Sequence, residues 1–474
     1  MGFRVNQDEI KTSYTHTLSE FTADLTYDSI PPEVRERAKF IAMQTVGVGL
    51  AAKGTPIGER SVALGRFTGG VVSEGGATLW TTGEKSSVAG AAFCNSTLAD
   101  ALDWEDCSWT GHPSASIVPV AFAVAEAEHK SGKDYITAIV AAYEVYQRIA
   151  MAVQPPENWP NYKGWGLTSW QSFAGVLPAA KLYGLNAEQV NQALGFGATN
   201  CTVPGQLHHV TMSDAYHYEH GYRSMDGVVA AMNVKLGVSN YTDALDDPWS
   251  FENHMCVSPS PDWYTKDLGK RWLTMETLLK HWPANMWIQT PLELTEELLR
   301  SHDIRKEDIA EIVVDPPTFL RMYYSPEGYS SMMQGQFSIP FMLAALILDR
   351  TPGSNWCDEA KLHDPELLAL AGKIHGGGSE MLYMPKCFKN FQQGHHPVIT
   401  VTIKTNGGKE YSKTMEGHLG HPRMMMTPQQ FKERFLIQAA PSLSPDALEK
   451  AADALASVEQ CDDMAQIGAM LRNN

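Results

Sequence analysis

The sequence predicts a mainly α-helical protein in which a large all-helical domain is interrupted by a smaller α+β unit. Residues 1 to about 270 contain long stretches rich in Ala, Val and Gly with apolar side chains at helical spacing, whereas β-branched runs ended by turn residues follow after Trp272. A chain of 474 residues is also long enough for more than one hydrophobic core. The predicted parts are residues 1–272 (helical domain), 273–415 (α+β domain) and 416–474 (C-terminal completion of the helical domain).

The first clear helix signal is Pro31-Pro32, because prolines suit the first turn of a helix and strong helix formers follow them. The next residues, 40–52, are apolar and rich in small side chains, which suits a helix packed closely against others. In residues 135–153, apolar side chains recur at helical spacing. Further helices are predicted at residues 87–101, 117–129, 177–182, 187–198 and 227–236.

After Trp272 the pattern changes to a mixture of strands and helices. Residues 309–315 form a β-branched run stopped by Pro316-Pro317, which predicts a short strand. A hairpin is predicted from residues 398–403 and 410–415, since Asn406-Gly407-Gly408 between them is a turn sequence. Residues 292–301 and 341–348 are predicted helices, and helical sequence returns from Thr427 onward.

Composition excludes several classes of protein. With 43% hydrophobic and 19% charged residues the chain has an ordinary globular composition, and no apolar run approaches the ~18 residues of a membrane span. The N-terminus lacks an apolar signal-peptide core, and Asn6 stands where a myristoylation signal has Ser or Thr, so we expect a cytoplasmic protein. The seven cysteines include no CxxC pair, which favours reduced, buried thiols over disulfides or a zinc site.

The net charge of −17, from 37 basic and 54 acidic residues, disfavours nucleic acid and anionic membranes as partners. A site for an acidic substrate would therefore need its own local positive groups.

The densest cluster of reactive side chains runs from Asp103 to Ser114. It contains Asp103, Glu105, Asp106 and His112, after a predicted helix that ends near Ala101. Crowded carboxylates beside an imidazole acquire different pKa values through burial and mutual charge, as acid/base catalysis requires. The glycine and proline that flank His112 indicate a fixed loop. The alternative is a solvated acidic loop with a hydrogen-bonded histidine.

The sequence resembles the MmgE/PrpD family, whose members include dehydratases, decarboxylases and epimerases of small carboxylic acids. That family is marked by an Asn, a conserved acidic segment and a His-Pro-Ser triplet. The matching positions here are Asn95, Asp103, Glu105, Asp106, Cys107, His112-Pro113-Ser114, Tyr143-Glu144-Val145 with Arg148, residues 181–185, Gly221 with Gly227, Lys280 before Trp282-Pro283, Phe337-Ser338, Gly417 and Gly420-His421-Pro422.

The resemblance implies a large helical domain with a smaller lid domain, a homodimer, and catalysis without cofactor or metal in the cleft between the domains. It implies that Asp103 is an acid/base residue and that His112 is an acid/base or carboxylate-binding partner. Cys107, Asp106 and Lys280 are expected in substrate binding. The implied chemistry is removal of a proton or a carboxylate next to a carboxylate, through an enolate-like intermediate that positive groups must stabilise.

The chain departs from the family pattern at several positions. Trp165 stands where relatives commonly have a His, and we expect it to contact the substrate. Tyr216 and Glu219 stand in place of a Lys and a His, Phe341 in place of a Tyr, and Asp100 in place of a His. The substrate of a named relative therefore cannot be transferred to this chain.

A second cluster surrounds these replacements. Residues 208–220 contain His208, His209, His217 and His220 together with two tyrosines. One hypothesis is that His217 or His220 supplies the proton-transfer group, with Tyr216 or Tyr218 as a donor; in this hypothesis His217 and Tyr216 are catalytic and His220 binds substrate. The alternatives are a metal site, since His at i and i+3 can share a helical face, and a polar helix that lines a cleft without catalysing.

Tryptophans form the last signal. The tryptophans are Trp159, Trp165, Trp170, Trp282 and Trp287. They predict an aromatic-lined pocket, or alternatively ordinary core packing.

The leading functional prediction is a cofactor-independent hydro-lyase that abstracts the proton next to a carboxylate of a small carboxylic acid. The alternatives are an epimerase or isomerase that works with two bases, a decarboxylase of an unsaturated polycarboxylate, and a non-catalytic scaffold that binds a carboxylate or a protein partner. Buried, crowded carboxylates argue against the scaffold, because they cost stability without serving a binding surface.

Overall fold

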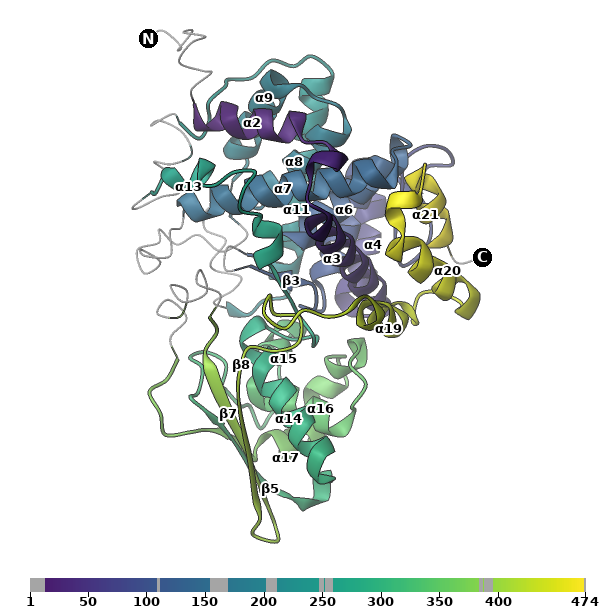
Figure 1. Cartoon of the computed structure of the whole chain (residues 1–474). Helices are drawn as coiled ribbons and strands as arrows, with labels where there is room; N and C mark the ends of the chain where they lie inside the picture. Colours follow the sequence, from purple (N-terminus) through teal and green to yellow (C-terminus); the bar gives the residue numbers. More distant parts are fainter. Residues whose placement is uncertain are drawn as a thin grey trace.

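The helical part of the protein is built from closely packed helices. The computed structural model describes residues 13–108, 111–153, 169–201, 211–246, 251, 259–382, 387 and 395–472. Helices α6 and α7 lie in its interior, and α11 packs on both α5 and α8 beside them (Figure 1). The helices of this part are α2 (Tyr14–Asp24), α3 (Pro32–Ala51), α4 (Pro56–Gly69), α5 (Val88–Asp100), α6 (Ser114–Ala127), α7 (Gly132–Val153), α8 (Ser172–Leu182), α9 (Ala187–Thr199), α11 (Ala215–Lys235) and α13 (Asp262–Thr265).

Local signals in the sequence account for the helix ends. Ser87 caps α5, because its side chain accepts a hydrogen bond from the backbone N–H of Gly90. Helix α3 begins with proline at its first position, as predicted, and Thr427 and Gln430 form the reciprocal capping box of α19 (Pro428–Ala439). The predicted helices are thus confirmed, although the helix predicted at residues 227–236 is α11 and begins earlier, at Ala215.

Helix α7 is long and apolar enough, by length and composition, to cross a membrane. Its 22 residues include Glu144 and Arg148 among the apolar side chains, so it is not a continuous apolar run. The apolar window is 100% buried inside the protein, which is typical of a central core helix.

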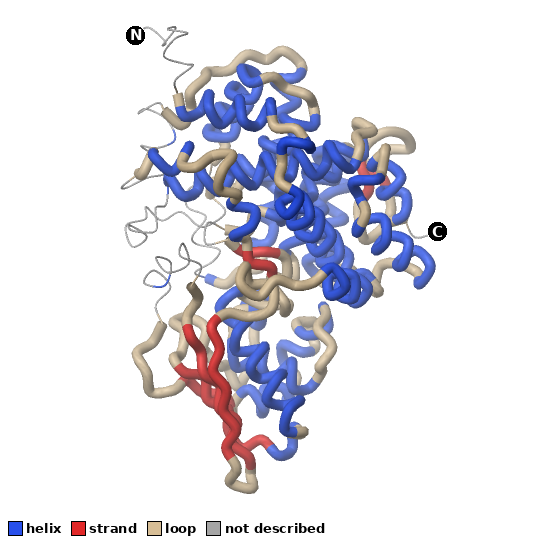
Figure 2. Tube along the Cα trace, viewed as in Figure 1, coloured by secondary structure: helices blue, strands red, loops and turns tan. Residues whose placement is uncertain are grey.

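The α+β part lies at one end of the molecule, where most of the strand residues gather (Figures 1 and 2). Its four-stranded sheet has the order β6-β5-β7-β8; β5 pairs parallel with β6, and the other pairs are antiparallel. The predicted strand and hairpin are confirmed. The elements are β5 (Ile309–Asp315), β6 (Ile374–Gly376), β7 (Val398–Thr405), β8 (Glu410–Glu416), α14 (Gln289–His302), α15 (Met332–Gln336), α16 (Ile339–Leu348) and α17 (Pro365–Ala371).

Buried and more exposed side chains alternate along β7, and this explains how one face of the sheet is covered. Ile399, Val401 and Ile403 are buried, and the intervening residues are more exposed. Helix α14 packs against β7 and β8, so the buried side chains of β7 contribute to the core of this part.

The C-terminal helices return to the helical part. They are α19, α20 (Pro445–Ala456) and α21 (Met464–Met470), and Figure 1 shows them, in yellow, beside α3 and α6. The Phe40 and Phe431 rings stack with centroids 4.6 Å apart, and the Ser442 hydroxyl donates to the Leu50 carbonyl. The C-terminal helices therefore pack on the helical part, and the division into domains at residues 272 and 415 stays a prediction.

The contact between α8 and α11 gives a test of how tightly the core is packed. A Cβ on Gly227 would lie 2.5 Å from the Val176 nitrogen and 2.6 Å from the Gly175 Cα, both of them backbone atoms. Glycine to alanine inside a helix ordinarily stabilises by about 1 kcal/mol. Here we expect Gly227→Ala to destabilise instead, because neighbouring backbone cannot move aside as a side chain can.

Thermal unfolding of Gly227→Ala checks this expectation, with Gly197→Ala of α9 as the matched control. A Cβ at Gly197 would meet only the side chains of Phe173 and Val176, at 3.2 Å. The midpoint should fall clearly for Gly227→Ala and change little for the control; equal midpoints would show that the two helices are not packed this closely.

Candidate active site

The end of α5 places four acidic side chains in the protein interior. The helix ends at Asp100, and the N–H of Asp103 donates to the Asp100 carbonyl at 2.8 Å, which closes a tight turn. Asp103 has a φ of 48°, an uncommon left-handed conformation for a residue other than glycine. The turn leads into the short strand β3 (Asp106–Cys107). Asp100, Asp103, Glu105 and Asp106 are all fully buried.

A lysine from a distant segment joins them. Strand β3 pairs antiparallel with β4 (Leu278–Leu279), and the N–H of Lys280 donates to the Glu105 carbonyl at 3.0 Å. The Lys280 ammonium group donates to Asp103 Oδ1 and to Glu105 Oε1, the latter at 2.8 Å, and it lies 3.3 Å from His112 Nδ1. Two carboxylates therefore hold one buried cation, and the predicted residues Asp103 and Lys280 are in direct contact.

Helices from both ends of the chain hold this strand pair in place. Gln44 of α3 donates from Nε2 to the carbonyls of Trp104, Glu105 and Lys280 at 2.8–3.0 Å. Arg434 of α19 donates to the Lys280 carbonyl at 2.7 Å from the other side. The position of Lys280 thus depends on α3, near the start of the chain, and on α19, near its end.

His112 lies between β3 and α6 and contacts the carboxylate of Glu105. Its Nδ1 lies 2.6 Å from Glu105 Oε1 and 3.1 Å from the Asp106 carbonyl, while Gln171 donates to the His112 carbonyl at 2.9 Å. The loop is therefore fixed from several sides, as predicted from its glycine and proline.

Asp106 has a different position from the one expected of a substrate-binding residue. Its Oδ1 accepts hydrogen bonds from the N–H and the hydroxyl of Ser114, and its Oδ2 accepts from the Tyr143 hydroxyl at 2.6 Å. Both oxygens are thus used within the protein. Asp106 anchors the first turn of α6 and the loop that carries His112.

The second predicted cluster meets the first one. Helix α11 packs closely on α5, and His217 Nδ1 lies 2.5 Å from Asp100 Oδ2. His220 Nε2 lies 3.2 Å from Asp100 Oδ1. The ring centroid of His112 is 5.9 Å from that of His220 and 6.2 Å from that of Tyr216. The residues predicted from two separate segments therefore belong to one site.

We call the seven interacting ionisable residues the buried ionic cluster. They share near-complete burial, with at most 4% of any side chain exposed. The members are Asp100, Asp103, Glu105, His112, His217, His220 and Lys280.

Burial and mutual charge shift the pKa values within the buried ionic cluster. Burial raises the pKa of Glu105 above its ordinary value, although Lys280 opposes this. Burial alone would lower the pKa of Lys280, but Asp103 and Glu105 outweigh it and raise that pKa, so the side chain stays an ammonium ion. Burial and Lys280 act to lower the pKa of His112; Glu105 and Asp103 more than compensate and raise it. The protonated form of His112 is therefore favoured relative to that of an ordinary histidine.

Several polar atoms of the cluster have no hydrogen-bond partner in the described ranges of the chain. A buried polar atom without a hydrogen bond lowers the free energy of unfolding, unless a ligand or water supplies the missing hydrogen bond. The contact between His220 and Asp100 is close enough for an ion pair but lacks hydrogen-bond geometry. The atoms are Asp100 Oδ1, Asp103 Oδ2, Glu105 Oε2, His217 Nε2 and both ring nitrogens of His220. Such an arrangement is typical of a site that hydrogen-bonds a polar ligand.

The donor atoms of Asp100, Glu105 and His112 lie within 4.8 Å of one another, a spacing that could hold a metal ion. Lys280, however, donates to Glu105 and lies 3.3 Å from His112, so a protein cation already stands among these donors. We therefore assign the positive charge among these three side chains to the Lys280 ammonium group and not to a metal ion.

The other residues named from the sequence have varied positions. The buried Cys107 thiol donates to the Ser108 carbonyl at 3.2 Å, and burial raises its pKa, so it stays a neutral thiol next to Lys280. Trp282 stacks on Trp356 with centroids 5.9 Å apart, and both rings are buried. The remaining predictions lie outside the described residues: Trp159, Trp165, His208 and His209.

Asp100 and Arg321 are the site residues that sequence reasoning missed. Asp100 was noticed as a departure from the family pattern and not as a contact of the histidines. Arg321 is buried, donates from Nε to Asn285 at 3.0 Å, and its guanidinium carbon lies 4.7 Å from the Phe337 ring centroid. Burial lowers its pKa to about 10, so it remains charged at neutral pH near Asp103. No motif surrounds it in the sequence.

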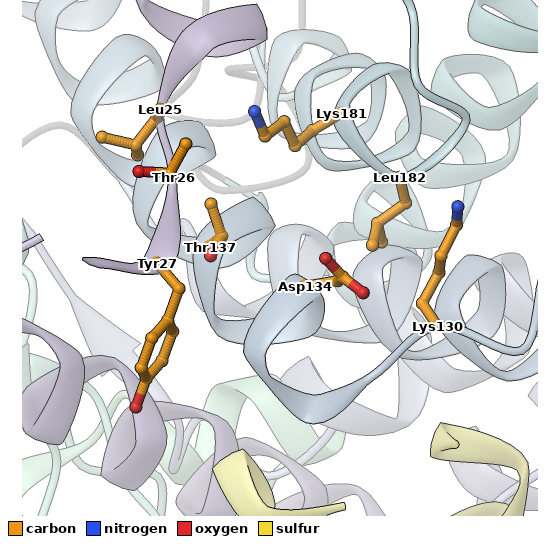
Figure 3. A pocket seen from close by; sticks show the side chains of 8 residues that line it. All are labelled: Leu25, Thr26, Tyr27, Lys130, Asp134, Thr137, Lys181 and Leu182. Carbon is orange, nitrogen blue, oxygen red and sulfur yellow. The ribbon is translucent and has the colours of Figure 1, made fainter. Parts of the chain in front are cut away.

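A separate cavity of about 280 Å³ lies elsewhere in the helical part (Figure 3). Thr26, Tyr27, Asp134 and Lys181 are among the residues that line it, and Lys181 donates to the Ala23 carbonyl at 2.6 Å. It contains no member of the buried ionic cluster, so the cluster and not this cavity is the candidate active site.

Comparison with known proteins identifies the family of the chain. Residues 16–263 match the MmgE/PrpD N-terminal domain, and residues 282–460 match the MmgE/PrpD C-terminal domain. The cis-aconitate decarboxylase of Aspergillus terreus is 23% identical over 439 residues, covering 86% of each chain. The human cis-aconitate decarboxylase is 22% identical over 482 residues, covering 97% of this chain and 95% of the relative. The chain belongs to the MmgE/PrpD family and is an enzyme of that family.

Proposed function

We propose that the protein is a lyase that acts on a small di- or tricarboxylic acid by proton transfer at a carbon next to a carboxylate, with water as the leaving group. The observation that carries this proposal is the shared contact of Lys280 with Asp103, Glu105 and His112 in the protein interior. It brings together the three components that such a reaction needs: a proton acceptor, a proton donor and a fixed positive charge.

Each component has a candidate residue. Asp103 Oδ2 has no hydrogen bond in the described part of the chain, so this oxygen is the proposed acceptor of the substrate proton. His112, whose protonated form is favoured by Glu105, is the proposed donor to the leaving hydroxyl group. Lys280 stabilises the negative charge that develops on the enolate-like intermediate. Burial of all three increases the strength of these electrostatic interactions.

The local charges also answer the question posed by the net charge of −17. Lys280 and Arg321 are buried cations close to Asp103. They supply positive charge for an acidic substrate inside a protein whose overall charge would repel it.

Decarboxylation is the second candidate function. The relatives named above are cis-aconitate decarboxylases, and loss of carbon dioxide leaves the same kind of carbanion next to a carboxylate. It needs only a proton donor after carbon–carbon cleavage, whereas loss of water needs both a base and an acid. The presence of both in the buried ionic cluster favours the hydro-lyase.

Proton NMR in deuterated water tests the proposal and separates these reactions. The purified protein is incubated with a panel of hydroxy- and unsaturated di- and tricarboxylates, and product masses are determined afterward. We expect vinyl signals to appear or disappear with gain or loss of water. Loss of carbon dioxide would make the decarboxylase the function. Exchange of the proton next to the carboxylate with an unchanged skeleton would indicate an epimerase, and no change with any acid would refute the proposal.

A further inference from the structure

Asp100 binds two histidines of α11 in unequal ways. Its Oδ2 lies 2.5 Å from His217 Nδ1, a short and well-formed hydrogen bond. Its Oδ1 lies 3.2 Å from His220 Nε2, without hydrogen-bond geometry. All three side chains are fully buried, so neither contact is weakened by solvent.

We propose that Asp100 is a positioning residue that holds His217 by Nδ1, so that the opposite ring nitrogen, Nε2, donates a hydrogen bond to the substrate. His217 Nε2 is buried and has no hydrogen bond in the described part of the chain. An imidazolium ring held by a carboxylate at one nitrogen has a single donor left, aimed away from that carboxylate. The inference rests on the proposed function for the identity of the acceptor, a substrate carboxylate.

The surrounding charges differ for the two rings. Burial lowers the pKa of His217, but the charge and hydrogen bond of Asp100, with Asp214 and Asp103 in addition, raise it to about 9. Burial is the main reason that the pKa of His220 falls to about 4; Asp100 opposes it, and the positive charges of His112, His217 and Lys280 lower the pKa further. One histidine is therefore a cationic donor at neutral pH and the other a neutral ring with a lone pair.

The raised pKa of His217 determines how its hydrogen bond to the substrate depends on pH. His217 carries its donor proton below about pH 9 and loses it as the pH rises through that value. Asp100→Asn removes the negative charge but keeps an oxygen of the same shape. The pKa of His217 should then fall by more than two pH units, to the ordinary histidine value of about 6.5 or lower.

Histidine titration by NMR tests the proposal without any substrate. The full chain is labelled with ¹³C at histidine Cε1, and His217→Gln and His220→Gln assign the two resonances. In the unaltered protein we expect one ring to stay protonated to about pH 9 and the other to stay neutral down to about pH 4. Asp100→Asn should move the His217 titration below pH 7. Titration of both rings near 6.5, or no movement in the variant, would overturn the proposal.

Asp226→Asn is the matched control for this experiment. Asp226 lies on the same helix and pairs with Arg223 at 3.2 Å, so the variant removes one negative charge from α11 without touching His217. The His217 titration should be unchanged in it. An equal shift in both variants would assign the effect to the general charge of the helix and overturn a specific role for Asp100.

Kinetics with the substrate identified by NMR give the functional readout. At pH 8, Asp100→Asn should raise KM by tenfold or more with kcat changed by only a few-fold, and the alkaline limb of kcat/KM should move down with the His217 titration. An unmoved alkaline limb would overturn the proposal. If no acid is turned over, the proposed function fails while the titration still decides the role of Asp100.

Discussion

Asp103→Asn is expected to reduce kcat by a factor of about 10²–10⁴, the usual contribution of a general base. Asparagine has the same shape and can still accept a hydrogen bond from Lys280, but it cannot take up a proton. Steady-state kinetics on the substrate identified by NMR measure the loss, and an unchanged thermal midpoint would show that the fold is intact.

Glu105→Gln separates proton transfer from the electrostatics of Lys280. Glu105 is the other carboxylate at the same ammonium group, 2.8 Å away, so its loss changes the charge around Lys280 to a similar degree. We expect a smaller fall in kcat than for Asp103→Asn. Glu105 also lies 2.6 Å from His112 Nδ1, so equal losses would mean that Asp103 contributes no more than the negative charge that both carboxylates supply. A fully active Asp103→Asn would remove Asp103 from the mechanism.

Lys280→Met is expected to have the largest effect on stability. The change leaves Asp103 and Glu105 buried without their cation, and breaking a buried ion pair by removing one partner costs roughly 3–5 kcal/mol. The midpoint of urea unfolding should fall accordingly, and turnover should be lost. An unchanged midpoint would show that Lys280 does not neutralise the two carboxylates.

The double variant Lys280→Met with Asp103→Asn provides the control. Neutralising one of the stranded carboxylates should recover part of the lost stability, with a coupling energy of about 0.5–3 kcal/mol between the two positions. Additive losses would place the two side chains out of contact. Turnover should stay absent in the double variant, since the proposed base and the cation are both missing.

Much of the fold could be predicted because its signals are local. Ser87 caps α5, Pro32 starts α3, and two prolines follow β5 at the positions that the sequence pattern indicated. The hairpin of β7 and β8 follows from its Asn-Gly-Gly turn. In each case a few adjacent residues determine the backbone conformation.

The arrangement of the site depended on contacts that no local pattern reveals. Strands β3 and β4 have two residues each and pair across about 170 residues of sequence, yet this pairing brings Lys280 to Asp103. Asp106 belongs to the same motif as Asp103, but its oxygens are occupied by Ser114 and Tyr143, the latter from α7. A motif therefore identifies which residues crowd together, and only the packing of distant helices decides which of them remain available to a substrate.

The central claim is proton transfer at a carbon next to a carboxylate, and deuterium incorporation tests it most directly. The reaction is run in the hydration direction, in which water adds to the unsaturated acid, in deuterated water with the unaltered protein and with Asp103→Asn, and the position of deuterium in the hydroxy acid is read by NMR. We predict deuterium on the carbon next to the carboxylate with the unaltered protein, and at least a hundredfold slower incorporation with the variant, the lower end of the expected loss of about 10²–10⁴. Turnover that leaves this carbon free of deuterium would contradict the account.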